Sequence, residues 1–126
     1  MQGQHTVFEY MYRDAGNFKT VGYLVLAGWD PDADAAIRSS LEWSGQFVAE
    51  QIGVPPLCEE HWLATGEAPS DLDHAFHEFM GLRPATEDEM ATAVWGSLEL
   101  LISRMRSAAG RWDVTLSPNC GPARVL

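Results

Sequence analysis

Two runs of alternating residues in the first thirty positions constrain the fold of this chain more than any other feature. Residues 5–13 place three aromatic side chains on one side of a strand, and residues 18–27 alternate in the same way. The connection 14–17 contains Gly16, which can take the positive φ that a tight turn needs. The pattern predicts an N-terminal β-hairpin, and both of its faces are apolar enough to be mostly covered.

Capping signals mark the start of two helices. Asp30 offers a side-chain oxygen to free helical amides and Pro31 has the φ of a first helical position, so a helix is predicted from there to a stop at Gly45. Thr86 opens a capping-box pattern ahead of a longer apolar stripe that ends before Gly110. The second prediction is therefore one long helix that could cover a whole sheet.

Two further strands are expected. Residues 75–83 alternate and lead through a short turn into a capped helix, as the hairpin does, which favours a strand there over a helix. Residues 112–116 alternate as a final strand. The prolines and polar residues within 46–73 predict an irregular excursion on the surface, in which residues 46–49 are a candidate short strand. Residues 118–126 are expected to be a loose tail.

These elements predict a single two-layer α+β domain over residues 1–126. The order is strand, strand, helix, irregular segment, strand, helix, strand, in a mainly antiparallel sheet of four or five strands with both helices on one face. A chain of 126 residues that is 46% hydrophobic can bury a core without a disulfide or a metal.

The charge of the chain argues against nucleic-acid binding. Its 18 acidic and 8 basic residues give a net charge of −10, and no lysine or arginine lies between Arg38 and Arg83. Because nucleic-acid affinity rests on cations that displace counterions, we expect no direct contact with nucleic acid. Without a long apolar run or a basic, apolar leader, we also expect no membrane contact and a cytoplasmic location. A bacterial source is expected as well.

Trp62 is the predicted centre of a protein-binding surface. It lies in the acidic, loosely patterned part of the chain, and aromatic side chains dominate contact energy while charges select the partner. We therefore expect a protein partner with a basic surface. The carboxylates grouped with Trp62 are Glu59, Glu60, Glu67, Asp71 and Asp73. The exposed face of the hairpin around Glu9, Arg13 and Lys19 is the alternative interface.

Four residues are candidate metal ligands. Cys58 and His61, then His74 and His77, have the paired spacing of a structural zinc site. Against this, residues three apart on a strand point to opposite faces, so His74 and His77 would diverge. The apolar content also suffices to fold the chain. We therefore expect no metal and no cofactor.

The segment from Cys58 to Glu78 carries an alternative function, a small metal-dependent or Cys-His hydrolase. His77 would be the base, Asp73 or Glu78 would orient it, and Cys58 or Cys120 would be the nucleophile. The order His-x-x-His-Glu differs from the metalloprotease patterns, and no phosphate-binding glycine motif is present.

The preferred function is non-catalytic. We expect a small acidic protein that binds another protein and regulates or assembles it. A further alternative is an acidic inhibitor that imitates nucleic acid and occupies a basic groove.

Overall fold

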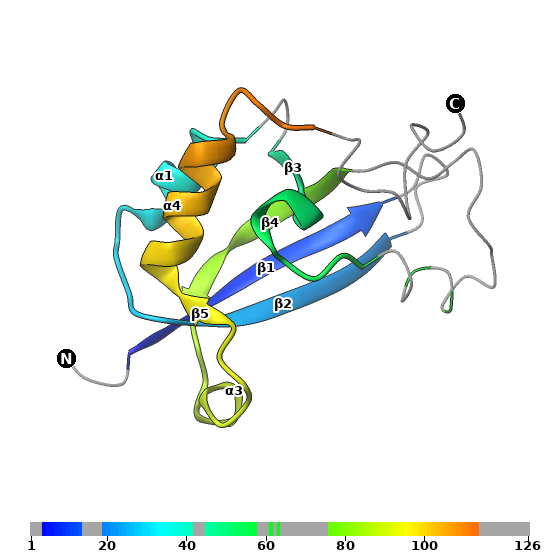
Figure 1. Cartoon of the computed structure of the whole chain (residues 1–126). Coiled ribbons are helices and arrows are strands. Elements are labelled where there is room, and N and C mark those ends of the chain that lie inside the picture. The colour runs from blue at the N-terminus through cyan, green and yellow to red at the C-terminus, as the bar shows by residue number, and fades with distance from the viewer. Residues whose placement is uncertain are drawn as a thin grey trace.

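A computed structural model describes residues 4–13, 19–41, 45–57, 61, 63 and 76–113. Within these ranges the chain forms a five-stranded sheet with the order β3-β4-β1-β2-β5, and helices lie against it (Figure 1). The predicted α+β class is confirmed. In chain order the elements are β1 (His5–Arg13), β2 (Lys19–Ala27), α1 (Ala33–Arg38), β3 (Gln46–Val48), the 3-10 helix η1 (Ala49–Ile52), β4 (Phe76–Pro84), α3 (Glu87–Met90), β5 (Gly96–Ser97) and α4 (Leu98–Ala108).

The sheet is mainly antiparallel, as the sequence predicts. β1 and β2 form the N-terminal hairpin, with register from His5 opposite Ala27 to Arg13 opposite Lys19. β4, the strand predicted for 75–83, lies antiparallel along the other side of β1, and β3 lies antiparallel to β4. The β5 strand is parallel to β2, but it reaches only the last two residues of β2.

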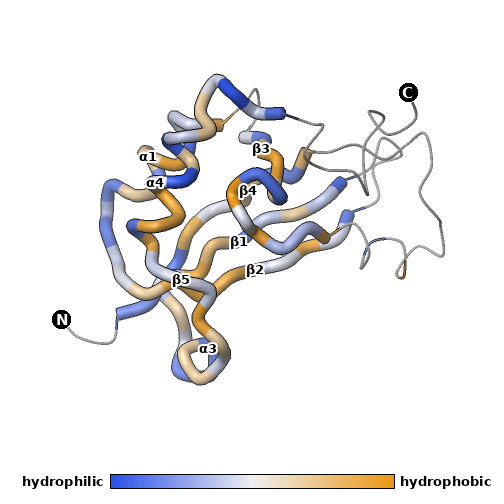
Figure 2. Tube along the Cα trace, in the orientation of Figure 1, coloured by the Kyte–Doolittle hydropathy of each residue, from blue (hydrophilic) through white to orange (hydrophobic). Residues whose placement is uncertain are grey.

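An aromatic cluster forms the centre of the core. The ring of Phe8 on β1 stacks on Phe79 of β4 at 5.1 Å between centroids and meets Phe47 of β3 edge-on at 5.8 Å. Helices α1 and α4 pack on this cluster and on each other, so both lie on one face of the sheet, as predicted. Figure 2 shows hydrophobic and hydrophilic residues alternating along α4, as expected for a helix with one buried face. None of the helices described is long and apolar enough to cross a membrane.

The prediction of one long second helix is wrong. The capping box at Thr86 is present, but the helix that begins there, α3, ends after Met90. The backbone then turns to the sheet, where the amide of Trp95 donates to the carbonyl of Val25 at 2.9 Å and β5 pairs with β2. A second cap follows, because Ser97 Oγ accepts from the amide of Leu100 at 2.9 Å and begins α4. Hydrogen bonds to a strand distant in sequence thus override the helical pattern.

The first helix is shorter than predicted. Asp30 Oδ1 accepts from the amide of Asp32 at 2.9 Å, but regular helix begins only at Ala33. At the other end, the hydroxyls of Ser39 and Ser40 donate to the carbonyl of Ala36, and such local bonds compete with helical ones. The helix therefore ends at Arg38, well before Gly45.

Two other predicted segments differ from the structure. Within the segment 46–73, β3 is the candidate short strand of residues 46–49, whereas the 3-10 helix η1 that follows was not predicted. Trp112 is not in a strand, and its indole nitrogen donates to the carbonyl of Ser40 at 2.9 Å. The rest of the predicted final strand and the predicted tail 118–126 lie outside the described residues.

Candidate functional site

The surface predicted around Trp62 lies outside the described residues. The same holds for its five carboxylates, Glu59, Glu60, Glu67, Asp71 and Asp73. The structure does place the alternative interface, the outer face of the hairpin. There Arg13 pairs with Glu78 of β4 at 3.1 Å, and Glu9 pairs with Arg83 at 3.1 Å.

Two of the four candidate metal ligands, His61 and His77, are described, and both are buried. Their rings flank Tyr12, with centroids 4.8 Å and 5.3 Å from its ring. His77 Nε2 accepts from the amide of Leu57 at 2.9 Å, so the lone pair that a metal would need at Nε2 is engaged. Cys58 and His74 lie outside the described residues, among which no group of three or more potential ligands is arranged to hold a metal.

The hydrolytic arrangement is described only for His77 and Glu78. Neighbouring residues of a strand point to opposite faces, and here His77 faces Tyr10 and Tyr12 in the core while Glu78 pairs with Arg13 on the outer face. Glu78 is therefore not placed to orient the imidazole. Asp73, Cys58 and Cys120 lie outside the described residues.

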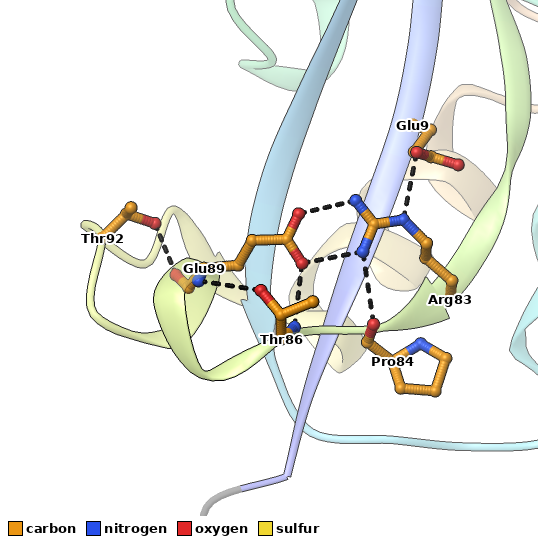
Figure 3. A network of polar contacts seen from close by, with 6 residues as sticks. All are labelled: Glu9, Arg83, Pro84, Thr86, Glu89 and Thr92. Atoms are coloured by element: carbon orange, nitrogen blue, oxygen red, sulfur yellow. Dashed lines mark hydrogen bonds and ion pairs between the residues drawn. The ribbon is translucent and has the colours of Figure 1, made fainter.

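A network around Arg83 ties α3 to the sheet (Figure 3). The guanidinium of Arg83 donates to both carboxylate oxygens of Glu89, at 2.7 and 2.6 Å, and to Glu9 on β1 at 3.1 Å. The pKa of Glu89 is lowered to about 2, mainly by the hydrogen bond from Arg83 and next by that from the Thr86 amide. The same carboxylates raise the pKa of Arg83. Because the guanidinium of Arg83 and the carboxylates of Glu9 and Glu89 are hydrogen-bonded to one another, we assign the network a structural role.

This network should make stability depend on acidic pH. The pKa of Glu89 falls from 4.5 to about 2 in the folded state, so its contribution is present above about pH 5 and is lost as the pH falls through the folded pKa. In urea denaturation, Glu89→Gln should be less stable than the wild type near neutral pH, and the gap should narrow between about pH 5 and about pH 2. Glu87→Gln on the same helix, outside the network, is the matched control. A gap of constant size would contradict the assignment.

Alternate residues of β2 direct their backbone N–H and C=O groups away from β1, toward the other edge of the strand. The amide of Gly28 donates to the carbonyl of Gln4 at 2.9 Å, which marks the bonded pairs of the ladder. Since bonded and non-bonded pairs alternate, the odd-numbered residues of β2 direct their backbone groups away from β1. The carbonyl of Val25 follows this rule, because it accepts from the amide of Trp95 on that side.

Farther along β2, no strand of the described residues pairs with this edge. β5 pairs only with Leu26 and Ala27, so the outward backbone groups of Lys19, Val21 and Tyr23 meet no strand in the part of the chain that is described. The side chains of Val21 and Tyr23 are 57% and 50% exposed, so the prediction that both hairpin faces are mostly covered is wrong here. We call residues 19–23 the open edge.

A cleft of about 810 Å³ lies between the loop ahead of α1 and the exposed side of α4. Trp29 stands at this cleft with 43% of its surface exposed, outside the core cluster. Sequence reasoning did not single out Trp29. Its exposure could have been predicted from its position between Gly28 and Asp30, in a short link outside any predicted strand or helix. The charged residues that line the cleft are Asp30, Asp32, Glu99 and Arg106.

In the comparison with known proteins, the chain matches no protein-family model, no curated protein and no solved structure.

Proposed function

We propose that this chain is a non-catalytic protein that binds a partner protein and regulates or assembles it, and that the partner adds an extended strand to the open edge. The observation that carries the proposal is the outward backbone of Lys19, Val21 and Tyr23, which lacks a neighbouring strand among the described residues. Exposed strand edges are ready templates for pairing with another chain, and an extended peptide can gain affinity from the main-chain hydrogen bonds.

The side chains of the open edge support this use. Val21 and Tyr23 belong to the residue types that stabilise strands, and both sit exposed on the outer face beside the edge. Aromatic and β-branched side chains on a pairing strand contribute cross-strand contacts. An added strand would cover these two side chains as well as the backbone, which gives both affinity and sequence preference.

Charge favours a basic partner over a second copy of the chain. Each chain carries a net charge of −10, so two copies repel each other, whereas a basic protein is attracted and its association is accelerated. The open edge itself carries only Lys19, and across the strand pair Arg13 is engaged with Glu78. A basic partner would gain most from the acidic remainder of the molecule.

Selection from a displayed library of random peptides tests the proposal with a defined probe. We expect enriched peptides to alternate β-branched or aromatic residues with lysine or arginine. In calorimetric titration with the enriched peptides, Val21→Pro should bind about tenfold more weakly, because it removes an outward amide while sparing the ladder to β1. Val21→Thr keeps the amide and a branched side chain, so it should bind as the wild type does.

The fold of Val21→Pro is checked first by circular dichroism and by amide NMR spectra. Failure of the library to enrich any peptide, or equal binding to the wild type and to a folded Val21→Pro variant, would contradict strand addition at the open edge. A wild-type protein that elutes as a dimer, and as a monomer after Val21→Pro, would instead place a second copy of the chain there.

A further inference from the structure

We propose that the cleft between α1 and α4 binds an organic cation, an ammonium or guanidinium group that lies against Trp29. The cleft, of about 810 Å³, is within the usual size of small-ligand sites. It is distinct from the open edge of β2, because its walls come from the loop 27–32, α1 and α4. The inference therefore stands independently of the proposed strand addition.

Trp29 supplies an accessible aromatic surface. Trp29 lines this cleft and also a second hollow of about 400 Å³ that Pro84 and Met90 border. A large aromatic side chain with 43% of its surface exposed forfeits burial that the core would give it. Tryptophan is the best of the aromatic residues at attracting a cation to its face.

The charges along the cleft select a cation. Three acidic residues line it, Asp30, Asp32 and Glu99, against the single basic residue Arg106. Asp32 stands at the N-cap of α1, yet its side chain makes no capping hydrogen bond to the helix. One oxygen of Asp30 is already used by the Asp32 amide, which holds the loop in place. The carboxylate of Asp32 thus remains available at the cleft.

The apolar part of the walls completes the match to an organic cation. Ala36 of α1 and Ile102 of α4 line the cleft together with the buried Leu98. Such walls favour the carbon atoms of a methylated ammonium or of a lysine or arginine side chain over a hydrated metal ion. The cation could belong to a free small molecule or to a basic side chain of a peptide.

NMR titration of the ¹⁵N-labelled full chain tests this with defined probes: argininamide, choline, the peptide Gly-Arg-Gly and inorganic phosphate at constant ionic strength. We expect the cations to shift the indole signal of Trp29 and amide signals of α1 and α4, and phosphate not to. Trp29→Ala should weaken cation binding about tenfold, and Trp29→Phe should weaken it less. Tighter binding of Gly-Arg-Gly than of argininamide identifies a peptide side chain as the source, and the reverse identifies a free molecule.

Charge variants give the sign of the electrostatics. The double variant Asp32→Asn with Glu99→Gln should weaken cation binding about tenfold, whereas Arg106→Gln should strengthen it about threefold. Asp34→Asn on α1 is the matched control, since Asp34 pairs with Arg38 outside the cleft and its loss should leave affinity unchanged. Shifts with phosphate but not with cations would overturn the proposal. So would cation affinities that the folded Trp29→Phe and double variants leave unaltered.

Discussion

Phe8→Ala is expected to lower the free energy of unfolding by about 3–5 kcal/mol, because it leaves a cavity where three aromatic rings now meet. Phe8 is fully buried at the centre of β1, and its ring contacts those of Tyr10, Phe47 and Phe79. These partners come from three strands, so the cavity would loosen β1, β3 and β4 together. Urea denaturation followed by circular dichroism measures the loss.

Tyr23→Ala is the matched control for this prediction. Tyr23 is also aromatic and lies in the same hairpin, but half of its surface is exposed, so its removal should cost no more than about 1 kcal/mol of strand preference. If Phe8→Ala lost no more stability than Tyr23→Ala, the aromatic cluster would not be the centre of the core.

Patterns that are local in sequence predicted most of the fold. The alternation in β1, β2 and β4 and the capping box at Thr86 are confirmed, because a strand period or a cap is encoded within a few residues. The break after α3 was missed for the opposite reason. It depends on the bond from Trp95 to Val25, a residue 70 positions away, and the helical period around it gives no sign of that partner.

The candidate sites depend on which elements become neighbours, and the sequence predicted them less well. The sequence predicted that both faces of the hairpin are mostly covered, but Val21 and Tyr23 are exposed, and β5 pairs only with the end of β2. Likewise Glu99 lines the same cleft as Asp30 and Asp32 only because α4 packs beside α1. A sequence pattern reports which side of an element is apolar. It does not report what lies across from it.

The buried hydrogen bond from Leu57 to His77 should also carry measurable stability. His77→Leu keeps a side chain of similar size but leaves the buried Leu57 amide without its acceptor, which should cost about 1–3 kcal/mol in urea denaturation. The amide of Leu57 should then exchange faster with deuterium than in the wild type.

His77→Gln retains an acceptor and should recover part of the lost stability and part of the lost protection from exchange. The loss of stability should extend to β2, because Leu57 packs over Gly22. A Cβ added at Gly22 would lie 2.7 Å from Leu57 Cδ2. Equal exchange at Leu57 in the wild type and His77→Leu would show that this amide does not depend on the imidazole.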